Sequence, residues 1–107
     1  MSEISVTRQD QGNVFEARQD DMIVFRLEEN LTTGYGWEVE TAEVSVVKFI
    51  ESTYFEATGM AIGHDGTRVL RFVARSPGSQ DIRLRLRRPW DPPEKAPEHL
   101  KVTILVR

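Results

Sequence analysis

The chain has 107 residues, a net charge of −3 and no cysteine. Its length suits one domain, residues 1–107, and its charge argues against nucleic-acid binding by the molecule as a whole. The lack of cysteine excludes disulfides, thiolate metal sites and cysteine nucleophiles, and no apolar run approaches the roughly 20 residues of a membrane-spanning helix.

Apolar residues alternate with polar ones along most of the chain, which is the period of a β-strand with one buried face. Residues 81–87 are the clearest case, because Ile82, Leu84 and Leu86 alternate with charged residues. No segment has an apolar repeat of 3.6 residues, so no amphipathic helix is expected. In chain order, the expected strands lie near residues 4–6, 14–15, 22–27, 37–39, 44–50, 53–55, 67–75, 81–87 and 100–107.

Turn residues separate these strands, among them Gln-Gly-Asn at 11–13 and Ser-Pro-Gly at 76–78. About seven to nine short strands joined by turns predict an all-β fold, a sandwich or a barrel. The residues expected to face its core are Ile23, Phe25, Leu27, Leu70, Phe72, Ala74, Ile82, Leu84, Leu86, Leu100, Val102, Ile104 and Val106.

Groups that could form a catalytic centre do not converge in this sequence. The two histidines, His64 and His99, stand alone, without the spacing of a zinc site. A nucleophile motif of the Gly-x-Ser-x-Gly type and a phosphate-binding glycine loop are both missing. We therefore expect no enzymatic activity, no metal and no cofactor.

Three loops, each following a strand, carry residues suited to contact. The first, residues 30–35, combines glycine, threonines and an aromatic ring; glycine permits a positive φ, and tyrosine is a rigid amphipathic anchor. The second, residues 59–66, holds three glycines and a histidine. The third, residues 88–97, begins with Arg-Pro-Trp and has four prolines, which stiffen it and forbid a central strand. Tryptophan and arginine are enriched at binding hot spots.

The order of the strands places these loops together. In an immunoglobulin-like sandwich, the loops between strands B and C, D and E, and F and G emerge at the same end. The three loops fall at these junctions, so we expect one continuous binding edge. Trp37 is expected in the core, as the tryptophan of strand C, whereas Trp90 is expected to be exposed for binding because its neighbours are polar or proline.

The three loops resemble those of chagasin-type inhibitors of papain-like cysteine proteases. That family has the motifs Asn-Pro-Thr-Thr-Gly-aromatic, Gly-x-Gly-Gly and Arg-Pro-Trp or Arg-Pro-Phe, and this chain shows similar motifs in the same order over nearly its whole length. The matching residues are Asn30, Leu31, Thr32, Thr33, Gly34 and Tyr35, then Gly63, His64, Asp65 and Gly66, then Arg88, Pro89 and Trp90.

The resemblance implies an immunoglobulin-like sandwich that inhibits such proteases tightly, reversibly and without a covalent bond. The first loop would enter the cleft over the catalytic cysteine, with Thr32, Thr33 and Gly34 nearest to it. The second and third loops would grip the walls of the cleft on either side. The partner would be a papain- or cathepsin-type protease, and the inhibitor is expected to be a monomer.

Two residues depart from the family motifs. Leu31 stands in place of proline, which removes a constraint on the first loop, and Asp65 stands in place of glycine, which puts a carboxylate on the second loop. Residues 30–32 also match a glycosylation sequon. We take this match as coincidental, since a glycan there would block the first loop.

Other functions compete with inhibition. A generic immunoglobulin-like adhesion or scaffold module would use the same loops for another partner, and an enzyme would need His64 and Asp65 as a site. A polyanion binder would use the arginines at 71, 75, 83, 85, 87 and 88, but in such a sandwich the strands that carry them are expected in different sheets. We expect no nucleic-acid or membrane partner. A soluble protein without a signal peptide is expected, either cytoplasmic or a mature secreted or periplasmic form.

Overall fold

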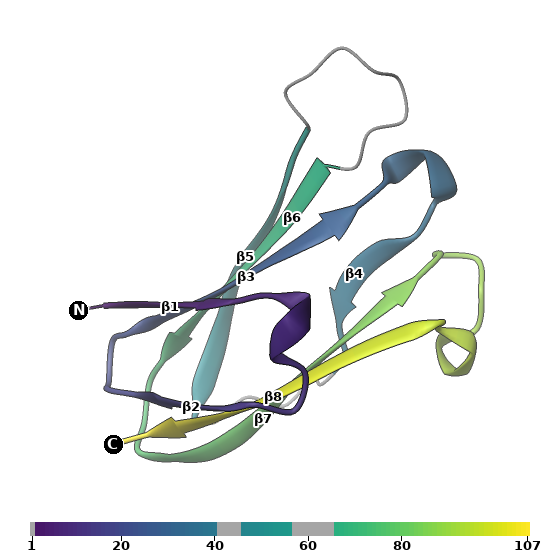
Figure 1. Ribbon diagram of the computed structural model, residues 1–107. Coiled ribbons are helices and arrows are strands. Elements are labelled where there is room, and N and C mark those ends of the chain that lie inside the picture. Colours follow the sequence, from purple (N-terminus) through teal and green to yellow (C-terminus); the bar gives the residue numbers. More distant parts are fainter. Residues whose placement is uncertain (1, 41–45, 57–65) are drawn as a thin grey trace.

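The computed structural model describes residues 2–40, 46–56 and 66–107 (Figure 1). These residues form two four-stranded sheets, with strand orders β1-β3-β6-β5 and β2-β8-β7-β4. The two sheets face each other as an immunoglobulin-like β-sandwich, which confirms the predicted fold class. The strands are β1 (Glu3–Val6), β2 (Val14–Ala17), β3 (Met22–Glu29), β4 (Gly36–Val39), β5 (Val47–Phe55), β6 (Gly66–Ala74), β7 (Gly78–Arg87) and β8 (Glu98–Val106).

The strand pairing is mainly antiparallel. Among the described strands, β1 with β3 and β2 with β8 run parallel, and the four other pairs are antiparallel. In the strand orders, β1 and β2 are each the edge strand of one sheet. Both chain ends lie at the end of the sandwich opposite the first and third loops (Figure 1). Strands β6 and β7 lie in different sheets. The arginines on these two strands are therefore divided between the sheets, as was expected when a polyanion-binding surface was considered.

The core lies between the sheets and is built by the alternating apolar residues. Every residue predicted to face inward is buried, except Leu86, which is half-buried and packs against the core. Phe72 makes edge-on ring contacts with Phe25, at 5.6 Å between centroids, and with Phe49, at 5.3 Å. Each large apolar side chain that is fully buried contributes about 1.5–3 kcal/mol. Trp37 is also buried, which confirms its predicted place in the core.

Strand β5 differs from the prediction of two strands at 44–50 and 53–55. It is continuous from Val47 to Phe55, with a shift in register between Phe49 and Glu51. A β-bulge of this kind accommodates one extra residue, here Ile50, without ending the strand. The change of alternation at the bulge therefore made one strand look like two. Residues 44 and 45 lie outside the described residues.

Short 3₁₀ turns occur in three of the connections: Arg8–Asp10, Leu31–Thr33 and Pro93–Lys95. The last turn begins with proline. Proline suits the first helical position because a backbone N–H there has no acceptor within the helix, so its absence costs nothing. Among the described residues, no helix is long and apolar enough to cross a membrane.

Candidate functional site

Strand register brings the strand ends that carry the three loops to one end of the sandwich. Glu29, the last residue of β3, pairs with Gly66, the first residue of β6, so the first loop starts where the second loop ends. Gly36, the first residue of β4, pairs with Arg87, the last residue of β7, so the first loop ends where the third begins. The two stems of the first loop are thus paired with the strand that follows the second loop and with the strand that precedes the third.

Of the second loop, the structure describes only Gly66. This glycine is buried, and a Cβ on it would lie 2.3 Å from the Tyr54 hydroxyl oxygen and 2.5 Å from the Phe55 carbonyl oxygen. Glycine is therefore required where the second loop joins β6. The predicted site residues Gly63, His64 and Asp65 lie outside the described residues.

The first loop is held in a 3₁₀ turn by its own polar side chains. The Asn30 carboxamide oxygen accepts from the Thr32 backbone N–H (3.0 Å) and from the Thr32 hydroxyl (2.6 Å). The Thr33 hydroxyl donates to the Asn30 carbonyl (2.8 Å) and accepts from the Tyr35 N–H (3.2 Å). Gly34 ends the turn with φ +81°, a conformation that favours glycine. These contacts explain why Asn, Thr, Thr and Gly occur in this order.

The third loop is shaped by Arg87, the last residue of β7. Its guanidinium donates to the carbonyl oxygens of Asp91 (2.9 Å) and Pro89 (3.3 Å). The same group donates to both carboxylate oxygens of Glu38 on β4, at 2.9 and 3.0 Å. These hydrogen bonds lower the pKa of Glu38, and Glu38 in turn raises the pKa of Arg87. A fixed ion pair on the sheet therefore holds the loop backbone.

Arg88 joins the third loop to the first. Its Nε donates to the Asp91 carboxylate (2.7 Å), which raises the pKa of Arg88. Its guanidinium carbon lies 4.7 Å from the ring centroid of Tyr35 and 5.5 Å from that of Trp90. Both distances fall in the range of cation–π attraction. The cation therefore sits next to one aromatic ring from each loop.

Trp90 remains 68% exposed, as predicted, and Leu31 in the first loop is 53% exposed. Phe55, at the end of β5 next to the second loop, is 51% exposed. Half of the six exposed large apolar side chains among the described residues therefore lie in or beside the three loops. Exposed apolar groups gathered at one place are typical of a protein-binding surface.

A buried polar group beneath the first loop was missed by the sequence analysis. Glu29 is 2% exposed, and its carboxylate accepts from the Trp37 backbone N–H (2.7 Å) and from Nε and Nη2 of Arg68 (3.1 and 2.7 Å). The Tyr54 hydroxyl donates to the Glu29 carbonyl (3.2 Å). A signal was present, since Glu29 and Arg68 extend the inward alternations of β3 and β6 with charged residues.

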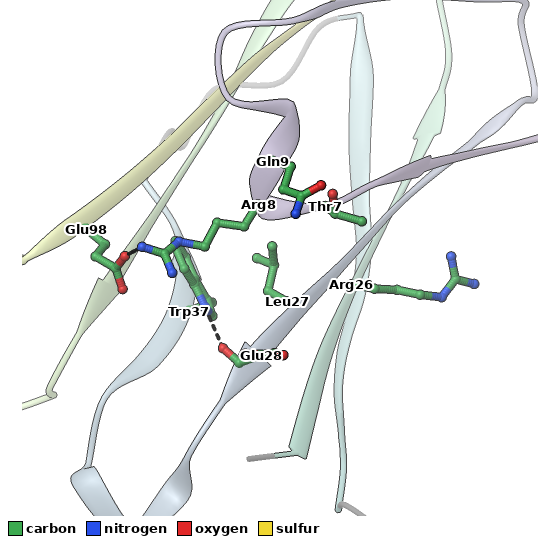
Figure 2. Close-up of a pocket in the computed structure, with 8 residues that line it drawn as sticks. All are labelled: Thr7, Arg8, Gln9, Arg26, Leu27, Glu28, Trp37 and Glu98. Carbon is green, nitrogen blue, oxygen red and sulfur yellow. Dashed lines mark hydrogen bonds and ion pairs between the residues drawn. The ribbon is translucent and has the colours of Figure 1, made fainter.

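A separate cavity of about 630 Å³ lies on the flank of the sandwich (Figure 2). Arg8 and Glu98 form an ion pair across it, and the Trp37 indole N–H donates to the Glu28 carbonyl (3.2 Å) at its wall. None of the motif residues that the structure describes lines this cavity. No cluster of metal-binding side chains occurs in the part of the chain that the structure describes.

The sequence profile of the chagasin family of peptidase inhibitors, I42, matches residues 16–104, so this chain belongs to that family. The match confirms the resemblance drawn from the loop motifs. It also confirms that the chain is an inhibitor of cysteine proteases, by family, and not an enzyme. Among curated proteins, no sequence matches at a significant level.

Solved structures share the fold over almost the whole chain. The cysteine protease inhibitor EhICP2 from Entamoeba histolytica superposes with a TM-score of 0.88 at 19% identity, covering 99% of this chain and 96% of its own. Amebosin gives 0.71 at 23% identity, covering 98% of both chains. PbICP-C, solved in complex with falcipain-2, gives 0.60 at 15% identity, covering 98% of this chain and 89% of its own. At these identities the likeness shows the fold.

Proposed function

We propose that the chain inhibits papain-like cysteine proteases by inserting the edge formed by its three loops into the active-site cleft. The observation that carries the proposal is the direct packing of the first loop against the third, through Trp90, Arg88 and Tyr35, with Trp90 exposed. PbICP-C, whose fold is similar, was solved in complex with the protease falcipain-2, which supports the same class of partner here.

The conformation of the first loop explains how it could occupy a cleft without being cut. The Thr33 N–H donates to the Asn30 carbonyl (3.2 Å), and the Gly34 N–H donates to the Leu31 carbonyl (3.2 Å). These backbone groups are therefore engaged within the turn and are not free to pair with a cleft as an extended peptide does. A thiolate attacks only a carbonyl that is aligned with the oxyanion hole. A closed turn would occupy the cleft without presenting a carbonyl in this alignment, so it would be cleaved poorly.

Rigidity of the edge favours tight binding. The first loop is fixed by its internal hydrogen bonds, and the third by Arg87 and Glu38. Loops that are already ordered lose little conformational entropy on docking. An interface of about 1,600 Å² is compatible with nanomolar affinity, or about −12 kcal/mol.

The roles assigned to the individual residues follow from this arrangement. Thr32, Thr33 and Gly34 would lie over the catalytic cysteine, and Trp90 would pack on one wall of the cleft. Gly63, His64, Asp65 and Gly66 would contact the opposite wall, as the family resemblance implies.

Titration of papain with the purified protein, followed with a fluorogenic peptide, tests the proposal. Stoichiometric and reversible loss of protease activity is expected, together with much weaker inhibition by Thr32→Arg, because a bulky charge cannot be desolvated in the cleft. No inhibition of papain or of several cathepsins by the folded protein would reject the proposal in favour of a binding module for another partner. Full inhibition by Thr32→Arg would remove the first loop from the cleft.

A further inference from the structure

The first loop crosses from one sheet to the other. Strand β3 belongs to the sheet of β1, β5 and β6, whereas β4 belongs to the sheet of β2, β7 and β8. The two stems of the loop are therefore not joined by a backbone ladder, as they would be in a β-hairpin. Something else has to fix the distance and angle between them.

The Glu29 carboxylate makes that connection. Glu29 is the last residue of β3, and it accepts a hydrogen bond of 2.7 Å from the backbone N–H of Trp37, the second residue of β4. One side chain thus joins the two stems across eight residues of chain.

Arg68 ties the same carboxylate to a third strand. Its Nε and Nη2 donate to Glu29, and it lies on β6 two residues after Gly66, where the second loop ends. The Arg68 guanidinium also lies 5.4 Å from the ring of Tyr54, whose hydroxyl donates to the Glu29 carbonyl. The polar group therefore connects the first loop to β5 and β6, the two strands that flank the second loop.

Stability alone does not call for charged residues at this place. A buried ion pair is often no more stabilising than apolar side chains of similar volume, because both charges lose their hydration. Glu29 has no exposed side-chain surface, and Arg68 keeps about a fifth of its own. What the pair provides, and apolar groups would not, is directional hydrogen bonding to a backbone N–H at the loop stem.

We propose that Glu29 is a positioning residue, oriented by Arg68, which fixes the first loop relative to the strands that carry the second. Its effect on inhibition rests on the proposed function, whereas its effect on the loop does not. Loss of the carboxylate frees the two stems of the first loop to move relative to each other while the sheets stay folded.

Amide hydrogen exchange in the free protein tests the positioning role directly. In Glu29→Gln, exchange at the amides of Thr33, Gly34 and Trp37 is expected to accelerate about tenfold or more, since charged hydrogen bonds are lost, while the amides in the centre of β7 and β8 keep their protection. Glu51→Gln is the matched control: Glu51 pairs with Arg71 (2.9 Å) across the same strands, β5 and β6, but is exposed. Unchanged exchange in the first loop of Glu29→Gln would overturn the proposal.

Inhibition of papain provides the second test and separates positioning from general stability. Inhibition of papain by Glu29→Gln is expected to be weaker by about tenfold or more. Glu51→Gln is expected to inhibit papain as strongly as the unchanged protein does. The double variant Glu29→Gln with Arg68→Met removes the half-buried cation that has lost its carboxylate partner, so its Tm should recover while its inhibition stays weak. If inhibition recovers along with Tm, the role is merely structural and the proposal fails. If the unchanged protein does not inhibit papain, the proposed function fails, and the exchange experiment alone decides the positioning role.

Discussion

The indole of Trp90 in the third loop lies directly against Gly34 in the first. A Cβ placed on Gly34 would come within 2.6 Å of Cη2 and 3.2 Å of Cζ2 of Trp90. Gly34 also has φ +81°, so this position needs glycine both for its backbone conformation and for the space its neighbour occupies. The two loops therefore depend on each other for their shape.

Gly34→Ala should damage this arrangement. The positive φ costs an alanine about 1–2 kcal/mol, and the methyl group pushes the indole of Trp90 away. We expect inhibition of papain to weaken about tenfold or more, measured by titration, together with a loss of unfolding free energy of about 1–2 kcal/mol.

Gly12→Ala is the matched control for that experiment. Gly12 has nearly the same φ, +82°, but a Cβ there meets no atom within 4 Å, and the residue lies in the turn before β2. It should lose similar stability and keep full inhibition. Equal effects of both variants on inhibition would contradict a specific contact between Gly34 and Trp90.

Trp90→Ala should weaken binding to a sensitive protease by about 2 kcal/mol or more, as aromatic hot-spot residues do. Trp90 is 68% exposed in the free protein, so its truncation should leave the two sheets folded. Titration calorimetry or inhibition kinetics measures the loss. Val14→Ala, another exposed apolar truncation but on β2, is the control. Equal affinity of Trp90→Ala and the unchanged protein would exclude Trp90 from the interface.

Arg87→Lys should loosen the third loop. Lysine cannot reproduce the forked hydrogen bonding to Glu38 and to the carbonyls of Pro89 and Asp91 at once. We expect inhibition to weaken about tenfold or more, which corresponds to the loss of about one charged hydrogen bond. Arg83→Lys on the same strand is the control, because its contact with Asp81 is exposed and long, at 3.4 Å. Inhibition that stays at full strength in Arg87→Lys would show that this side chain does not fix the loop.

The alternation of the sequence was enough to predict an all-β fold and the residues facing its core, whereas the choice of a sandwich over a barrel came from the resemblance of the loop motifs. Alternation determines which face of a strand is buried, and β8 shows it along its whole length. In β3 it is broken by Val24, which is buried between Ile23 and Phe25. It failed at Ile50, where a bulge changes the alternation inside one strand. Bulges depend on the pairing partner, and a single strand's pattern does not contain that information.

The contacts that join the loops could not be predicted in the same way. Gly34 and Trp90 lie 56 positions apart in the chain, and their contact follows from the pairing of β4 with β7. The exposure of Trp90 was predictable from its polar neighbours. Glu29 continues the inward alternation of β3, but this signal is outweighed in a single sequence because charged residues are rarely buried without a partner. Its partner Arg68 lies on a strand whose register only the fold reveals.

Stability should decrease in acid. The pKa of Asp21 is lowered chiefly by the backbone N–H of Arg18, then by that of Ser2, the pKa of Glu38 chiefly by Arg87, and the pKa of Asp81 chiefly by the Thr103 hydroxyl. A carboxyl whose folded-state pKa is depressed stabilises the fold above its unfolded pKa and loses that contribution as pH falls through the folded value.

Urea unfolding between pH 7 and pH 2.5 measures this dependence. The unfolding free energy should change little above about pH 5 and decline below about pH 4, where unfolded carboxyls take up protons. Asp21→Asn should be less stable at neutral pH and decline less steeply, so that its curve approaches that of the unchanged protein in acid. Parallel curves for the two proteins would show that Asp21 does not contribute to the decline.

Leu31→Pro should stabilise the first loop. Leu31 is the first residue of the 3₁₀ turn, where proline's fixed φ and missing N–H are tolerated, and Asn30 before it is extended (φ −109°, ψ 108°), as a residue preceding proline prefers. The unfolded chain then has fewer conformations, so the unfolding free energy should rise by about 0.4–1 kcal/mol. Thermal and urea unfolding measure the gain. Leu31→Ala, which removes the exposed side chain without restricting φ, separates backbone rigidity from the loss of apolar contact with a protease. A destabilised Leu31→Pro protein would show that the turn does not have the backbone geometry described.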